Sequence, residues 1–259
     1  HRDLHRVDRR QRQMCIIDSN YPYVQPNFNV DYMQMYNFLQ TPPSLDLTNT
    51  NYTNVYKNSK KVADGLQKLG VKKGDVIGVM AWNNHCHLEV WYGIPGAGAV
   101  NHNLIPRLFS EQLIYIINHA NDKILIIDLD LVPIIEKIID DCPNVEKVVI
   151  LCSKADVPST KFSEVISYEE LLSMGSENFQ WVDGEETDAC GICYTSGTTG
   201  NPKGVVYTHR SNTLHALTQA APDMLNLSST DTVMPVVPLF HANGWSIAST
   251  APGVGSSIV

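Results

Sequence analysis

The stretch Tyr194-Thr195-Ser196-Gly197-Thr198-Thr199-Gly200-Asn201-Pro202-Lys203-Gly204 decides how the chain is read. Ala189–Tyr194 before it and the β-branched run 204–208 after it predict two strands that this bend joins, as in a hairpin. Its glycines let the backbone approach a ligand closely, and its hydroxyls and N–H groups can face one anion. Lys203 adds a mobile positive charge. The stretch therefore predicts a strand–loop–strand unit that binds a triphosphate.

The loop differs from the common phosphate-binding loop of nucleotide-binding proteins. That loop places Lys directly after Gly and runs into a helix. Here Lys203 follows Pro202, and a strand-like run comes next. A flexible turn rich in Gly and Thr is the alternative interpretation, and the length of the motif argues against it.

Upstream of the loop, apolar runs alternate with amphipathic stretches. The runs are apolar throughout, which is typical of strands covered on both faces. Right-handed crossovers then give a parallel sheet with helices on both faces, so the fold class is α/β. Strands are expected at 76–80, 99–104, 123–128 and 147–151, and helices at 54–69, 83–92, 110–120 and 131–139.

Finer expectations concern helix ends and the second half of the chain. Ser110 and Ser211 are expected to be N-caps, and the small residues at 93–98 to break the chain between two elements. A strand is expected at 231–237, restricted by Pro235, and a helix within 242–255. Residues 32–39 are expected to form a short helix, and 168–174 the only helix of an irregular stretch.

These elements divide the chain into four segments. They are an extension at 1–50, partly disordered, a first α/β subdomain at 51–152, a connection at 153–183, and a second, incomplete α/β subdomain at 184–259. Residues 1–13 hold almost nothing apolar, and Met14 is an alternative start of the native protein.

Composition narrows the class of protein. The 259 residues carry a net charge of −8, which argues against a nucleic-acid partner. The longest apolar region, 233–259, holds several prolines and glycines, so no transmembrane segment is expected. The six scattered cysteines indicate a reduced, intracellular protein.

Two groups of residues have metal or redox spacing. Cys190 and Cys193 are spaced like a redox or zinc pair, but a strand would turn them to opposite faces. His85, Cys86, His87 and His119 could meet at a metal, with ordinary buried or surface histidines as the favoured alternative.

The motif YTSGTTGNPKG resembles the phosphate-loop signature of the adenylate-forming, AMP-forming enzyme superfamily. The resemblance extends over about residues 51–259, including NLIPRLFSEQLIYIINHANDKILIID and MPVVPLFHANGW, and is strongest to medium- and long-chain fatty-acyl-CoA synthetases. It implies the N-terminal part of the adenylate-forming fold. It also implies ligase activity on a fatty acid with ATP, Mg²⁺ and coenzyme A.

The resemblance also assigns roles to residues. It implies that the loop holds the pyrophosphoryl part of ATP, that Lys203 neutralises the outer phosphates, and that Thr195 touches Mg²⁺ through the phosphates. It implies a catalytic role for His241 beside the carboxylate, where amino-acid-activating relatives carry Asp. Trp245 corresponds to a gate of the acyl tunnel, with core packing as the alternative, and Phe240 would contact the acyl chain. The residues expected to bind nucleotide are Thr195, Ser196, Gly197, Thr198, Thr199, Gly200 and Lys203.

The chain departs from the family pattern in extent. Motifs that supply the Mg²⁺-binding Glu, the ribose-binding Asp and the C-terminal lysine are not found within residues 1–259. The sequence is therefore interpreted as an N-terminal fragment without the C-terminal domain, inactive as a ligase by itself. A cytoplasmic location is expected, with peroxisome, mitochondrion and a homodimer left open. The alternatives in function are another carboxylate-activating enzyme and a nucleotide-binding pseudoenzyme.

Overall fold

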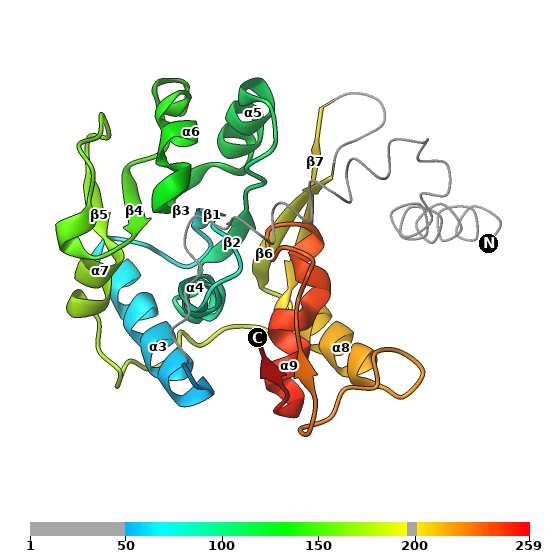
Figure 1. The fold of residues 1–259 in the computed structure, drawn as a ribbon. Helices are drawn as coiled ribbons and strands as arrows, with labels where there is room; N and C mark the ends of the chain where they lie inside the picture. Colours follow the sequence, from blue (N-terminus) through cyan, green and yellow to red (C-terminus); the bar gives the residue numbers. More distant parts are fainter. Residues whose placement is uncertain (1–49, 196–200) are drawn as a thin grey trace. The chain divides into compact units, whose positions relative to one another are not determined.

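A seven-stranded sheet forms the centre of the fold (Figure 1). The computed structural model describes residues 50–195 and 201–259. The strand order is β5-β4-β3-β1-β2-β6-β7, and all neighbours are parallel except the antiparallel pair β6 and β7. The strands are β1 (Val76–Met80), β2 (Val100–Asn103), β3 (Asp122–Asp128), β4 (Lys147–Leu151), β5 (Val165–Ser167), β6 (Ala189–Thr195) and β7 (Lys203–Thr208).

Helices cover both faces of the parallel part of this sheet (Figure 1). One face packs against α3 (Tyr52–Lys68), α4 (His85–Gly96) and α7 (Tyr168–Met174). The other face packs against α5 (Ser110–Ala120) and α6 (Val132–Glu136). Short 3₁₀ turns lie at η1 (Leu129–Leu131), η2 (Ile139–Asp141) and η3 (Lys154–Asp156). The predicted α/β class, with a mostly parallel sheet, is confirmed.

The chain reverses its direction of winding at β1. After β1 the chain adds β2 on one side, and it then crosses to place β3 on the other side. Open α/β sheets bind ligands at the carboxyl ends of strands near such a reversal. The segments that follow β1, β2, β3 and β6 all begin at this carboxyl edge.

Several boundaries follow the sequence pattern closely. Strands β1 and β4 and helix α7 occupy the predicted residues. Helix α3 buries Val55, Ser59, Val62 and Leu66 along one stripe, as its apolar spacing predicts. The connection at 153–183, expected to be irregular apart from α7, also contains β5, which pairs with β4. The division into subdomains at 152/153 and 183/184 stays a prediction.

The expected break at 93–98 is wrong for residues 93–96. Helix α4 continues through Gly93 and Pro95 to Gly96, and turns only at Ala97. A Cβ on Gly93 would lie 2.5 Å from Val62 Cγ1. The glycine therefore allows α3 and α4 to pack closely, and this tertiary contact outweighs its low helix propensity.

Both serine N-caps are also corrected. Helix α5 begins at Ser110 with Phe109 as the N-cap, and the Phe109 N–H donates to the Gln112 side chain. Helix α8 (His209–Ala220) has Thr208 as the N-cap, and the Thr208 hydroxyl accepts from the Ser211 N–H at 3.1 Å. In each case the strand or loop before the helix places an earlier residue at the cap.

The last part of the described chain is less regular than expected. The strand expected at 231–237 is only β8 (Thr232–Val233), which pairs in parallel with β9 (Ser257–Ile258). The helix expected within 242–255 is a turn, η4 (Ala242–Ser246), followed by α9 (Ile247–Val254). No helix in ranges 50–195 and 201–259 has both the length and the apolar character to cross a bilayer. The calls on residues 1–49, including the helix at 32–39, lie outside the described residues.

Candidate active site

The two ends of the glycine- and hydroxyl-rich loop lie side by side. Thr195 ends β6 and is paired in register with Lys203, which begins β7. The Thr195 hydroxyl donates to the Lys203 carbonyl at 3.5 Å, and the Lys203 side chain is exposed. Ser196, Gly197, Thr198, Thr199 and Gly200 lie outside the described residues. The hairpin predicted from the sequence is confirmed, and it starts from the carboxyl end of β6.

A network of polar and aromatic contacts anchors the strand that leads into the loop. The Tyr194 hydroxyl lies 2.6 Å from His119 Nδ1, and the centroids of the Tyr194 and His102 rings are 4.9 Å apart. His102 Nδ1 lies 2.9 Å from the carboxylate of Asp122, and both side chains are fully buried. Burial raises the pKa of Tyr194 to about 12, so the phenol stays neutral. The network therefore fixes β6 one residue before Thr195.

The predicted acyl-site residues lie in one turn. Phe240 is buried and packs edge to face on Trp82, with 5.7 Å between ring centroids. His241 is exposed, and Trp245 is 51% exposed. The five residues of η4, from Ala242 to Ser246, all have φ between 46° and 59°. Left-handed backbone costs free energy for residues other than glycine, and such strain clusters at functional sites.

Contacts from β2 and β6 hold this turn against the edge of the sheet. Asn103 Nδ2 donates to the Leu239 carbonyl at 3.3 Å and to Asn243 Oδ1 at 3.1 Å. Burial raises the pKa of the Cys193 thiol, and hydrogen bonds from the backbone of Ala242 and Asn243 oppose that effect. The turn that follows His241 is therefore in contact with the strand that ends at Thr195.

A third contact comes from the segment after β1. Asn83 Oδ1 accepts from the Leu239 N–H at 2.7 Å. Asp128 holds this segment from β3, because its carboxylate accepts from the Trp82 N–H at 2.6 Å and from Asn84 Nδ2 at 3.3 Å. Burial, the main cause, raises the pKa of Asp128 to about 6. The roles of Asn83, Asn103 and Asp128 were missed in the sequence, although polar residues at the ends of apolar strands were the available signal.

The structure places two members of the possible metal group, His87 and His119, outside the cluster that contains His85 and Cys86. The His87 ring is buried with Nδ1 3.0 Å from the Trp82 carbonyl, and His119 pairs with Tyr194. Cys190 and Cys193 are both buried in β6, and burial raises the pKa of Cys190 to about 11. Thiols of this kind are poor nucleophiles and metal ligands, so the redox interpretation of this pair gains no support.

Comparison with known proteins gives this arrangement a family. A model described as AMP-binding enzyme matches residues 40–259. The chain belongs to the AMP-binding enzyme family. The recognition made from the phosphate-loop motif is therefore confirmed.

The relatives of this AMP-binding enzyme include two fatty-acid–CoA ligases. The chain is 44% identical over 214 residues to a medium-chain-fatty-acid–CoA ligase of Ectopseudomonas oleovorans, and the match covers 83% of this chain and 39% of the relative. It is 40% identical over 210 residues to a long-chain-fatty-acid–CoA ligase of Thermus thermophilus, covering 81% and 37%. A solved long-chain-fatty-acid–CoA ligase of Archaeoglobus fulgidus superposes with a TM-score of 0.71 at 28% identity, covering 85% and 41%. The chain thus spans about two fifths of the length of these relatives.

Proposed function

We propose that this chain supplies the phosphate-binding and carboxylate-binding part of an AMP-forming fatty-acid–CoA ligase. The observation that carries the proposal is the hairpin that pairs Thr195 with Lys203 at the carboxyl edge of the sheet. The turn at His241 reaches the same edge through contacts with Asn103 and Cys193. The names of the similar ligases from Ectopseudomonas and Thermus agree with this activity.

The proposed reaction has two steps. The fatty-acid carboxylate attacks the α-phosphorus of ATP, which forms an acyl-adenylate and releases pyrophosphate. The thiol of coenzyme A then attacks the acyl carbon, and AMP leaves. Negative charge on the phosphates grows during the first step, so N–H groups, hydroxyls and a cation around them lower the barrier.

The residues divide this work as follows. The exposed Lys203 ammonium neutralises the outer phosphates, and the loop from Thr195 holds them. The donor set of hydroxyls and one lysine fits a magnesium-bound triphosphate, and Mg²⁺ would supply charge neutralisation between the phosphate oxygens. Thr195 lies at the loop end that would contact it. These loop roles rest on the motif and on the described ends of the hairpin.

The acyl side of the site is formed by the turn after β8. His241 is exposed next to the buried Phe240, so it can contact the carboxylate while Phe240 lines an apolar path. Trp245 is half exposed rather than buried in a core, which supports a side chain that moves as a gate. Fatty acid, ATP and coenzyme A are the proposed ligands, and a homodimer and a cytoplasmic location belong to the same proposal.

A second candidate has a specific observation in its favour. The chain is also 42% identical over 199 residues to a 3-methylmercaptopropionyl-CoA ligase of Ruegeria lacuscaerulensis, which covers 77% of this chain and 37% of that relative. A short sulfur-containing acid would then replace the fatty acid, with the same loop chemistry. Rates of acyl-CoA formation with acids of increasing length distinguish the two.

The test is Lys203→Met in the full-length gene product. We expect the rate of acid-dependent exchange between ATP and pyrophosphate to fall about 10²-fold or more, because a preorganised cation is lost. Lys137→Met, which removes another exposed lysine, is the matched control and keeps the parent rate. Unchanged exchange in Lys203→Met, or no exchange in the parent with any acid, would contradict the proposal.

A further inference from the structure

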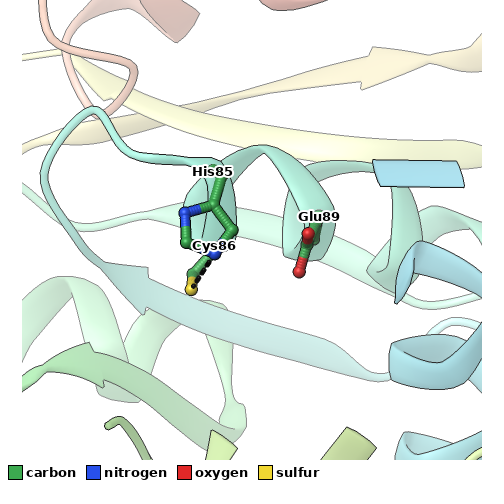
Figure 2. A group of neighbouring side chains, drawn as sticks. All are labelled: His85, Cys86 and Glu89. Carbon is green, nitrogen blue, oxygen red and sulfur yellow. Dashed lines mark hydrogen bonds between the residues drawn. The ribbon is translucent and has the colours of Figure 1, made fainter. Parts of the chain in front are cut away.

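Three donor side chains of different chemistry gather at the start of α4 (Figure 2). They are the imidazole of His85, the thiol of Cys86 and the carboxylate of Glu89. Their ligand atoms all lie within 4.8 Å of one another. Because residues three and four apart share a helix face, Glu89 reaches back toward the two residues of the first turn.

The distance between the first two donors suits a transition metal. His85 Nε2 lies 3.4 Å from Cys86 Sγ. A tetrahedral zinc ion with Zn–N of about 2.0–2.1 Å and Zn–S of about 2.3 Å places its nitrogen and sulfur ligands about 3.5 Å apart. This pair is therefore separated as ligands of one ion would be, and Figure 2 shows the two groups side by side.

The third donor is buried and oriented by neighbouring helices. Glu89 is fully buried, and its Oε1 accepts from Asn58 Nδ2 of α3 at 3.0 Å. Its Oε2 accepts from the Tyr168 hydroxyl of α7. Metal-bound carboxylates are held by hydrogen bonds of this kind, which fix their direction and raise affinity. Burying a carboxylate is costly, and a cation beside it offsets part of the cost.

Two of the three donors are only partly buried. His85 and Cys86 are half-buried, so water can reach the donor set from solvent. Nitrogen, sulfur and oxygen donors together favour zinc over magnesium or calcium, which prefer oxygen alone. This site is separate from the phosphate loop, which would use Mg²⁺.

We propose that His85, Cys86 and Glu89 bind a zinc-like divalent cation at the start of α4. The ion is held by three protein ligands and one water, and it stabilises the first turns of the helix. Those turns follow the segment whose Asn83 bonds the Leu239 backbone, so bound metal also steadies the base of the turn at His241. The binding does not depend on the proposed ligase activity.

The test uses the full-length gene product, stripped of metal and titrated with Co²⁺ and Zn²⁺ alone. We expect one ion per chain, a sulfur-to-cobalt charge-transfer band, and a melting temperature that rises with Zn²⁺. Cys86→Ser abolishes the band, and His85→Gln lowers the affinity for Zn²⁺ tenfold or more. Cys152→Ser, which removes another half-buried thiol, leaves band and affinity unchanged.

Glu89→Gln tests the buried ligand, provided that the variant keeps the circular dichroism of the parent. Because this variant can fail to fold, the proposal is decided by the two half-buried positions. It is overturned if the parent shows no charge-transfer band with Co²⁺. It is overturned equally if Cys86→Ser and His85→Gln bind Zn²⁺ as tightly as the parent does.

Discussion

Asn83 binds the backbone of the segment that carries His241, across more than 150 residues of sequence. Its Oδ1 accepts from the Leu239 N–H at 2.7 Å, and its Nδ2 donates to the carbonyls of Pro235 at 3.0 Å and Val237 at 3.3 Å. One side chain thus connects the end of β1 to the segment before Phe240.

Replacing Asn83 tests this contact. Asn83→Ala should lower the free energy of unfolding by about 1–2 kcal/mol, the net value of one or two hydrogen bonds. Asn83→Asp should lower the free energy of unfolding at least as much. Its carboxylate keeps the acceptor for the Leu239 N–H, but it cannot donate to the two carbonyl oxygens that it faces. Urea unfolding measures both. Asn144→Ala, at another exposed position, is the control, and an equal effect there would show that Asn83 has no special role.

The raised pKa of Asp128 predicts that the stability of the fold depends on pH. Burial raises its pKa from 3.8 in the unfolded chain to about 6 in the folded protein. Between these values the folded state binds a proton that the unfolded state does not, so stability falls as pH rises from about 4 to 6. The contribution is of the order of 3 kcal/mol, at about 1.4 kcal/mol for each pKa unit.

The measurement is urea unfolding between pH 4 and 7 for the parent and Asp128→Asn. The difference between their free energies of unfolding isolates this carboxyl from the other titrating groups, and it should change by about 2–2.5 kcal/mol across the range. Asp223→Asn changes an exposed position, and its free energy of unfolding should vary with pH as that of the parent does. If the difference in free energy of unfolding between Asp128→Asn and the parent did not change with pH, Asp128 would have the same pKa in the folded and unfolded states.

Replacing glycine with alanine should change stability in opposite directions at two helical positions, Gly93 and Gly253. A Cβ on Gly93 would meet Val62 Cγ1 at 2.5 Å and the Ser59 carbonyl at 3.0 Å, so Gly93→Ala should cost about 1–3 kcal/mol. A Cβ on Gly253 of α9 would meet nothing within 4 Å, so Gly253→Ala should gain about 0.5–1 kcal/mol. Thermal unfolding compares them. A gain at Gly93 would show that α3 and α4 are not tightly packed there.

The left-handed backbone at Ala242 predicts that alanine-to-glycine substitutions will have opposite effects on stability there and in a right-handed helix. Ala242 has φ of 46°, and glycine adopts this backbone without the penalty from Cβ. Ala242→Gly should therefore raise stability by up to about 1 kcal/mol, whereas Ala216→Gly in the right-handed helix α8 should lower it by about that amount. Differential scanning calorimetry of the two variants checks the sign. A loss at Ala242 comparable to the loss at Ala216 would contradict the left-handed conformation.

Much of the fold could be predicted from local patterns. Strands such as Val76–Met80 and Lys147–Leu151 are short apolar runs between polar turns, and their type and limits follow from composition alone. The hairpin around the loop was predictable for the same reason, since β-branched residues flank a glycine-rich bend. Helix ends were less predictable: α4 passes through Gly93 because α3 lies against it, and the sequence carries no sign of that neighbour.

The sequence alone determined that the chain is an α/β protein with a hairpin whose strands pair Thr195 with Lys203, because these features depend on residues close together along the chain. Only the tertiary structure decided which distant groups meet there: Asn83 with Leu239, Cys193 with the backbone after His241, and His119 with Tyr194. The physical reason is that such contacts depend on strand order and on the crossing of helices. Both are set by packing over the whole sheet, and no local spacing records them.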